Sequence, residues 1–556
     1  MKKILLLCLI LNVFLSELSQ AAPAYAFRVK FKDKNGTLTF ADSLQFLSQK
    51  ALTRRSNQGI MLDSTDLPLV QAYIDTVMTT AAAVKLHNKS KWFNQIVVIT
   101  FDSNKVTDIA ALPMVESVKL VARYPTGNFK TETSSKKFPV VEPITDKKTR
   151  GTAAHYGVAF QQIDLMQGDY LHDMGFKGEN MDIAVIDVNF RYANTCAVYD
   201  SINLQNRFKD YHNFVKDTPW VFSTSINNDH GMNVMGCMGA NMPGTYVGTA
   251  PNANFFLYIT EDIGSEQPIE EDNWISAAER ADSIGVYLIN SSLGYNIFDA
   301  PHSASSYTYN DMDGKTALIT QGGSMAVAKG ILVVCAQGNE GASAWHYMLA
   351  PADGDSVYSV GSVDGSGAWG NSGYGPNFLG VVKPDGMAMG KGSVLIGGSC
   401  NPGVSNGSSF ASPMMCGSIA CLWQSAPTLT NWEIRQIVRM SSDRYNNPNN
   451  THGYGIPNFQ QAHQIILGTD DVQQLDYRFS VYPNPSSGEL YIRSFDASLQ
   501  NFSYAVYDLQ GHLITRSEKV VQGSVHAQAF SALASGTYVV VIAAGGKVWS
   551  TKVVKR

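Results

Sequence analysis

Five short runs made almost entirely of apolar residues limit the fold of this chain more than any other feature of its sequence. Continuous runs, rather than alternating ones, are typical of strands that are buried on both faces of a parallel sheet. Helix-like stretches separate several of the runs, which predicts an α/β domain with a doubly wound, mostly parallel sheet. In such domains the site lies beyond the carboxyl ends of the strands. The runs span residues 183–186, 255–259, 286–289, 331–335 and 357–360, and the clearest helical stretches span residues 275–283 and 317–329.

Three segments at the ends of predicted elements supply the groups of a nucleophilic serine site. Asp187 ends the first run, His230 begins a predicted helix, and Ser409 begins another. A serine hydroxyl is a poor nucleophile at neutral pH, so it needs an imidazole base, which a buried carboxylate orients. The sequence therefore predicts Ser409 as the nucleophile, His230 as the base and Asp187 as the orienting carboxylate.

A fourth polar residue follows the run at 331–335. Asn339 comes directly after Gly338, and its side-chain amide can donate to the oxyanion that forms when a serine attacks a carbonyl. Taken alone, Asn339 also fits a turn residue. In the same chain as Asp187, His230 and Ser409, it predicts an oxyanion hole made by the Asn339 side chain and the backbone N–H of Ser409. Pro413 is expected to be tolerated near the start of the serine helix, because amides in a first helical turn lack an intrahelical acceptor.

These motifs, in their order along the chain, resemble those of the subtilisin-like serine proteases, the subtilases. The family order Asp, His, Ser is the order of Asp187, His230 and Ser409. Three motifs depart from the family pattern: Val188-Asn189 follows the Asp, Met232 follows His-Gly, and Ser408 and Phe410 flank the Ser. None of the departures removes a catalytic group. Further matching segments are Gly248-Thr-Ala-Pro251, Ser292-Leu293-Gly294, Gly338-Asn339, Lys383-Pro-Asp385 and Gly407-x-Ser409-x-Ala411-x-Pro413.

The resemblance implies a serine endopeptidase that hydrolyses peptide bonds through an acyl-enzyme intermediate. It also implies that the backbone of Ser292, Leu293 and Gly294 pairs with an extended protein or peptide substrate. Glu340 is the candidate for a charge at the rim of the neighbouring pocket, and Leu349 for its floor. The family needs no cofactor for its chemistry. Bound calcium is common in it, but no ligand loop here is distinctive enough to assign a metal-binding residue.

Other interpretations of the site need residues that the chain lacks. Gly323-Ser324 resembles the serine motif, but it lies in the helical stretch at 317–329, lacks the following proline and precedes Asn339. An esterase of the α/β-hydrolase class needs Gly-x-Ser-x-Gly, and a metalloprotease needs His-Glu-x-x-His. The remaining alternative is a catalytically inactive surface binding or adhesion protein on the subtilase fold. Loss of a triad residue would mark it, and none is lost.

The chain on either side of the predicted catalytic domain, residues 151–468, forms four segments. Residues 1–21 have the basic start, apolar run and small residues of a signal peptide. Residues 22–127 predict an α+β unit that resembles a subtilase propeptide, with an accessory domain as the alternative. Residues 128–150 are a Lys-, Thr- and Ser-rich linker suited to cleavage.

The C-terminal segment, residues 476–556, predicts a small all-β sandwich with alternating strands. It resembles the sorting domain of the type IX secretion system of Bacteroidetes, with a carbohydrate-binding or adhesive sandwich as the alternative. The resemblance implies that the type IX secretion machinery is a partner and that the protein is secreted or displayed on the cell surface.

Charge, hydropathy and cysteines exclude several classes of protein. A net charge of −5 leaves no broad cationic surface for nucleic acid, and no apolar run reaches the roughly 18 residues that span a membrane. Six cysteines follow the signal peptide without a C-x-x-C pair, which argues against a zinc site. Buried free thiols are predicted in preference to a disulfide. The six are Cys196, Cys237, Cys335, Cys400, Cys416 and Cys421.

Overall fold

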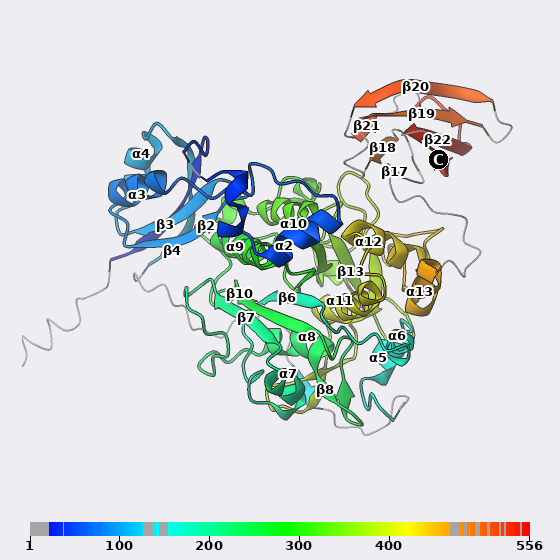
Figure 1. The fold of residues 1–556 in the computed structure, drawn as a ribbon, viewed down its shortest axis with the longest axis horizontal. Coiled ribbons are helices and arrows are strands. Elements are labelled where there is room, and N and C mark those ends of the chain that lie inside the picture. The colour runs from blue at the N-terminus through cyan, green and yellow to red at the C-terminus, as the bar shows by residue number, and fades with distance from the viewer. Residues whose placement is uncertain are drawn as a thin grey trace, which may run out of the picture.

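The computed structural model describes residues 22–36, 38–125, 138, 141–143, 154–467 and, in the tail, 479–482, 484, 486, 488, 490–494, 501–508, 512–521, 524–526, 530–544 and 547–556. They form an N-terminal α+β part, a central α/β domain and a C-terminal β part (Figure 1). The predicted signal peptide and most of the predicted linker lie outside the described residues. No helix in these ranges is both long and apolar enough to cross a membrane.

The N-terminal part is built on an antiparallel sheet with the strand order β2-β3-β1-β4. Side chains alternate along β1, so Phe27 and Val29 pack with helices α3 and α4, whereas Ala24 and Ala26 pack with Ile269 of the central domain. The elements are β1 (Ala24–Phe31), η1 (Phe40–Gln45), α2 (Gln49–Asn57), α3 (Gln71–Thr80), β2 (Lys85–Ser90), β3 (Gln95–Thr100), α4 (Lys105–Ala110) and β4 (Val115–Tyr124).

The described part of the central domain confirms the predicted doubly wound parallel sheet, in the order β14-β13-β12-β11-β6-β10-β7. Helices α9 (Ile269–Ile284) and α10 (Leu318–Ala328) cover one face, and α8 (His230–Gly239) and α11 (Ser408–Ser425) cover the other. The strands are β6 (Asp182–Asp187), β7 (Phe208–Asn213), β10 (Asn254–Ile259), β11 (Leu288–Ser291), β12 (Leu332–Ala336), β13 (Tyr358–Val363) and β14 (Gly386–Met389).

Helix α9 begins well before the predicted start at residue 275. Its first turn carries Glu270, Glu271 and Asp272, which are buried and favourable near a helix amino terminus. Polar residues at buried positions interrupt the apolar period, so the sequence pattern hides this turn. Gly285, in the left-handed conformation, ends the helix, and β11 therefore starts two residues after the predicted residue 286.

Shorter elements complete the central domain. They are β5 (Glu142–Pro143), α5 (Phe160–Asp164), α6 (Asp169–Asp173), η2 (Ala197–Tyr199), α7 (Asp200–Leu204), β8 (Asn241–Met242), β9 (Tyr246–Val247), η3 (Ser303–Ser305), η4 (Tyr309–Asp311), η5 (Glu340–Ala342), β15 (Ser393–Ile396), β16 (Pro402–Ser405), α12 (Asn431–Met440) and α13 (Phe459–Leu467).

The described tail consists of antiparallel sheets, as predicted for an all-β unit. One sheet has the order β17-β18-β21 and the other β20-β19-β22-β23. Leu490, Phe502, Val506 and Val540 belong to the core of the tail, which contains no described residue of the other parts. The strands are β17 (Phe479–Tyr482), β18 (Tyr491–Ser494), β19 (Asn501–Tyr507), β20 (Leu513–Val521), β21 (Ser524–His526), β22 (Gly536–Ala544) and β23 (Lys547–Lys555).

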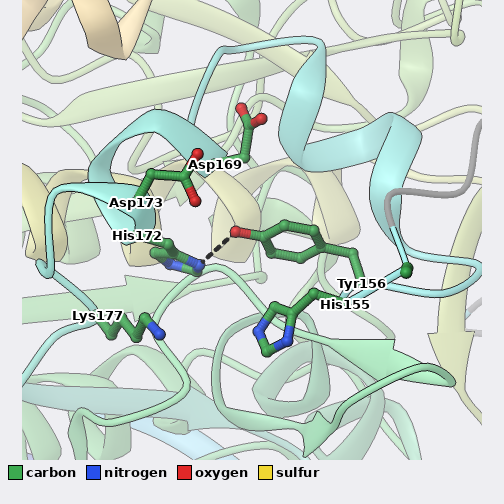
Figure 2. A pocket seen from close by; sticks show the side chains of 7 residues that line it. His155, Tyr156, Asp169, His172, Asp173 and Lys177 are labelled. Carbon is green, nitrogen blue, oxygen red and sulfur yellow. Dashed lines mark hydrogen bonds between the residues drawn. The ribbon is translucent and has the colours of Figure 1, made fainter.

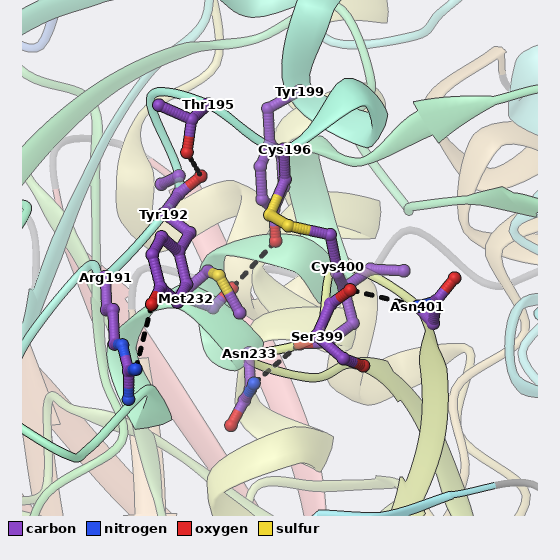
Figure 3. Close-up of a disulfide and its surroundings, with 12 residues drawn as sticks. Arg191, Tyr192, Thr195, Cys196, Tyr199, Met232, Asn233, Ser399, Cys400 and Asn401 are labelled. Carbon is purple, nitrogen blue, oxygen red and sulfur yellow. Dashed lines mark hydrogen bonds between the residues drawn. A yellow bond between two sulfur atoms is a disulfide. The ribbon is translucent and has the colours of Figure 1, made fainter. Parts of the chain in front are cut away.

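One prediction about the cysteines is wrong. Cys196 and Cys400 form a disulfide across a sequence separation of 204 residues (Figure 3). The bond joins the segment after β6 to the turn between β15 and β16, and no sequence spacing reveals that these two segments meet. For Cys237, Cys335, Cys416 and Cys421 the prediction of buried free thiols is confirmed.

Candidate active site

The carboxyl end of β6 and the start of α8 bring two of the predicted catalytic residues together. His230 Nδ1 lies 2.7 Å from Asp187 Oδ1, and both side chains are fully buried. The same carboxylate oxygen accepts the backbone N–H of Val188 at 2.8 Å. This contact fixes the orientation of the imidazole, as the sequence analysis requires.

Ser409 lies in the first turn of α11 and points its hydroxyl at a neighbouring strand end. Ser409 Oγ donates to the carbonyl of Ser292 at 3.2 Å. His230 Nε2 has no hydrogen-bond partner among the described residues. The serine–imidazole hydrogen bond is therefore not formed here, and such bonds often form only when substrate is bound.

Hydrogen bonds between β11 and α11 hold the serine segment in place. Ser292 Oγ donates to the carbonyl of Ser409 at 2.7 Å, and Ser412 Oγ donates to Asn290 Oδ1 at 2.8 Å. Pro413 lies beyond the first turn, contrary to the prediction, because α11 begins at Ser408. The carbonyl that lacks a proline N–H is that of Ser409, and Ser292 Oγ supplies the missing donor.

Asn339 is held by its oxygen, which leaves its NH₂ group available. Its Oδ1 accepts the backbone N–H of Ser408 at 2.8 Å and the hydroxyl of Ser408 at 3.1 Å. Glu340 folds back and accepts the backbone N–H of Asn339 at 2.5 Å, and burial raises the pKa of its carboxyl. Glu340 is thus engaged by its own loop and is not a free charge at the rim.

Leu349, the residue predicted for the pocket floor, lies close to both glycine segments. A Cβ added at Gly294 would lie 2.7 Å from Leu349 Cβ, and one at Gly338 would lie 2.9 Å from Leu349 Cγ. Both glycines therefore allow two backbone segments, the predicted substrate strand at Gly294 and the loop before Asn339 at Gly338, to approach Leu349.

Asn189 is a positioning residue that the sequence analysis noted only as a departure from the family pattern. Its Nδ2 donates to the carbonyls of Ser223 at 3.0 Å and Asn228 at 2.8 Å, in the loop that leads to His230. Its carbonyl accepts the N–H of Met232 at 3.2 Å. A Cβ at Gly231 would lie 2.6 Å from that carbonyl oxygen, which accounts for the glycine after His230.

Phe138, in the predicted linker, was also missed. Its ring centroid lies 4.6 Å from that of His230, and it packs with Val188, Ile226 and Ile263. The following strand β5 pairs antiparallel with β16, just before the serine helix. The only sequence signal was a Phe-Pro-Val-Val run at the end of a polar stretch, and only the fold places Phe138 against the imidazole of His230.

A separate pocket of about 290 Å³ shares no residue with this site (Figure 2). Within it, the hydroxyl of Tyr156 lies 3.0 Å from His172 Nδ1, and His172 Nε2 lies 3.1 Å from the carbonyl of Thr249. Burial lowers the pKa of His172 to about 4, so the ring is neutral with both nitrogens in use. His172 is therefore a structural residue.

Three parts of the chain match known families. Residues 26–137 match the peptidase S8 propeptide domain of Bacteroidota, residues 178–455 match the subtilase family, and residues 480–556 match the secretion system C-terminal sorting domain. The tail is thus a sorting domain for export to the cell surface or the extracellular space.

Individual proteins give the same result. Subtilisin E of Bacillus subtilis (strain 168) is 30% identical over 308 residues, which cover 54% of this chain and 70% of that protein. Subtilisin DY of Bacillus licheniformis is 30% identical over 311 residues, which cover 54% of this chain and 97% of that protein.

Among solved structures, fervidolysin from Fervidobacterium pennivorans, a keratinolytic enzyme related to subtilisin, aligns with a TM-score of 0.55 and 13% identity, covering 96% of this chain and 91% of that chain. At that identity the likeness shows the fold alone. Since the family pattern matches half of this chain and Subtilisin DY is matched over nearly its whole length, the chain belongs to the subtilase family.

Proposed function

We propose that the chain is an exported serine endopeptidase in which Ser409 is the nucleophile, His230 the general base and Asp187 the orienting carboxylate. The observation that carries the assignment is the buried 2.7 Å contact between Asp187 and His230 Nδ1. It leaves Nε2 as the basic nitrogen, on a ring that lies beside α11, the helix that carries Ser409 in its first turn.

In the proposed reaction, His230 Nε2 takes the proton of Ser409 as Oγ attacks the carbonyl carbon of a peptide bond. Asn339 Nδ2 and the Ser409 N–H donate to the oxyanion. His230 then passes the proton to the departing amine, which leaves an acyl-enzyme. Water attacks the ester with His230 again as base, which frees the acid and restores Ser409. Asp187 stays ionised throughout.

The proposed substrate is an extended protein or peptide segment that pairs with the backbone of Ser292, Leu293 and Gly294. The chain's own linker supports a cleft of this kind. Phe138 packs against His230, and β5 adds to β16 as an antiparallel strand. In strand addition, main-chain hydrogen bonds supply the affinity and pockets for alternate side chains supply the specificity. We assign no such pocket and therefore no preference for particular side chains.

The proposed partners are protein substrates and the type IX secretion machinery. No cofactor takes part in the proposed chemistry. Subtilases often bind calcium, and Glu261, Glu266 and Glu270 bring carboxylate oxygens within 4.8 Å of one another. Tyr295 donates a hydrogen bond to Glu261, and the backbone N–H groups of Asp262 and Gln267 donate to Glu270. Because Glu261 and Glu270 already accept hydrogen bonds from protein donors, we assign no calcium site to this cluster.

A fluorophosphonate probe tests the nucleophile without knowledge of the substrate. Processed wild-type protein should be labelled covalently, and Ser409→Ala should take up no label. Its turnover should fall by about 10⁶-fold, the loss measured for the same change in subtilisin. Ser324→Ala, in the look-alike motif on α10, is the matched control and should behave as wild type. Labelling of Ser409→Ala would refute the assignment, and unlabelled, folded wild type would favour the inactive binding protein.

A further inference from the structure

One segment of the propeptide contacts the catalytic domain away from the predicted active site. We call residues 48–66 the clasp. They include α2 and lie between β1 and α3, and Figure 1 shows α2 beside α9 and α10. The clasp contacts the carboxyl ends of α9 and α10 and the amino end of α12. The four-stranded sheet of the propeptide contacts α9 separately, for example through Arg28, whose guanidinium binds Asp272 at 2.6 and 2.7 Å.

Two consecutive arginines of the clasp share one carboxylate of the catalytic domain. Arg54 donates to Asp282 Oδ1 at 2.5 Å, and Arg55 donates to both oxygens of Asp282 at 2.8 and 2.6 Å. The side chains of Arg54 and Asp282 are completely buried, and that of Arg55 is 1% exposed. Charges removed from water to this degree are retained only where they are paired, and removal of one partner leaves the other uncompensated.

Backbone carbonyls at or just after the ends of α9 and α10 also accept hydrogen bonds from the clasp. Arg54 also donates to the carbonyls of Val286 at 2.5 Å and Lys329 at 3.1 Å. Ser48 Oγ donates to the carbonyl of Ile284 at 2.6 Å. The last carbonyls of a helix have no partner within the helix, so the clasp supplies donors that α9 and α10 lack.

The carboxyl-terminal part of the clasp adds hydrogen bonds, through Gln58, and ion pairs, through Asp66. Gln58 donates to the carbonyl of Gly330 at 2.8 Å and accepts the N–H of Asn431, the first residue of α12, at 3.0 Å. Lys329 donates to Asp66 at 3.0 Å, and Asp66 also binds Arg55 at 2.6 Å. Asp66 thus links Arg55 of the clasp to Lys329 of the catalytic domain.

Two glycines of the catalytic domain let the clasp approach the ends of α9 and α10 closely. A Cβ at Gly285 would lie 2.6 Å from the backbone N of Ala51, and one at Gly330 would lie 2.9 Å from Gln58 Nε2. Both glycines have positive φ. They end α9 and α10 and, lacking side chains, leave room for α2.

We propose that Asp282 and the carbonyls of Val286 and Lys329 form a guanidinium-binding site whose ligand is a helix with paired arginines. Its occupant is the clasp, and its role is to retain the propeptide on the enzyme after the linker has been cut. The binding site itself follows from the contacts above. The consequence for activation rests on the proposed function, because a retained propeptide delays activity only if the domain is a protease.

The test cuts the linker without the enzyme's own activity. A recognition sequence for an unrelated site-specific protease is placed within residues 128–150 of the full Ser409→Ala chain. After cleavage, the complex is diluted and dissociation of the propeptide is followed by size exclusion over time. Arg54→Ala should dissociate at least about 30-fold faster than the parent chain, since loss of one partner of a buried, hydrogen-bonded charge pair weakens association by that much or more.

Lys30→Ala is the matched control, because Lys30 forms an exposed pair with Glu116 within the propeptide at 2.8 Å. It should dissociate at the parent rate. Equal rates for Arg54→Ala and Lys30→Ala would overturn the proposal. If Arg54→Ala does not melt cooperatively, Gln58→Ala replaces it; dissociation several-fold faster than the control supports the clasp, and the control rate refutes it. Failure of Ser409 to label would reject the proposed function and leave this result unaffected.

Discussion

At the scale of single residues, Asn339 has two separable tasks. Its oxygen holds Ser408, while its NH₂ group is proposed to bind the oxyanion. We expect Asn339→Asp and Asn339→Ala both to lower kcat by about 10²- to 10³-fold, the range measured for such a donor in subtilisin. KM should change little, because the oxyanion exists only after attack. Steady-state kinetics on a peptide substrate measures both constants.

The aspartate variant separates the two tasks of Asn339. It keeps the acceptor that Ser408 uses and lacks the donor. Activity close to wild type in Asn339→Asp, with a loss in Asn339→Ala, would assign Asn339 a purely structural role.

Asp385 is a second residue whose effect can be predicted, and it acts on stability. Lys383 and Arg435 bind its buried carboxylate at 2.8 and 2.7 Å, and Arg439 also contacts it. Although burial alone would raise the pKa of Asp385, the three cations hold it well below its usual range. Asp385→Asn should lower the free energy of unfolding by about 3–5 kcal/mol, because the cations remain buried without a counter-charge. Urea unfolding at pH 7 measures this.

The pH dependence follows from the sign of that shift. A carboxyl whose pKa is depressed in the folded state stabilises the fold at pH values above its unfolded pKa, near 4. This stabilisation is lost as the pH falls toward the folded pKa. The difference between wild type and Asp385→Asn should therefore be largest at neutral pH and shrink below pH 4. Asp217→Asn is the control, since Asp217 is half exposed beside Lys85 and such pairs contribute little. A difference that grows in acid would contradict the assignment.

At the scale of elements, the disulfide joins the chain after β6 to the turn between β15 and β16. Cys196 and Cys400 thereby tie the segment that carries Asp187 to the one that leads to Ser409. Loss of the bond should reduce the free energy of unfolding by about 2–4 kcal/mol, because the unfolded chain regains the freedom of a long loop. The single variants Cys196→Ser and Cys400→Ser and the double variant should share one denaturant midpoint, which should lie below that of wild type. A double variant with the wild-type midpoint would refute the prediction.

At the scale of the whole molecule, the sorting tail is structurally separate from the protease. Its core contains no residue of the other parts, and Arg493 of β18 lies 3.5 Å from the partly exposed Asp355 of the central domain. A chain ending at residue 467 should therefore keep the melting temperature and activity of the catalytic domain. In a host with type IX secretion it should remain inside the cell, whereas full-length Arg493→Ala should be exported. Loss of activity on truncation would contradict this separation.

The apolar runs and the spacing of chemical groups were enough to predict much of the molecule. The strands at 183–186 and 331–335 form as β6 and β12, because burial on both faces demands uninterrupted apolar residues. Helix α2 and strand β2 escaped prediction because their residues are polar. In α2, Arg54 and Arg55 are buried and paired with Asp282, and a periodicity of apolar residues cannot reveal burial of that kind.

By itself, the sequence determined the nature of the central sheet, the identity and order of the proposed catalytic groups and the presence of an export tail. Each of these depends on residue type and local spacing, which the linear chain records. Only the tertiary structure decided three contacts: the Cys196–Cys400 disulfide, the packing of Phe138 against His230 and the binding of the clasp to Asp282. These contacts join residues far apart in the chain, and their energy arises from burial and charge pairing that exist only once the fold has brought the partners together.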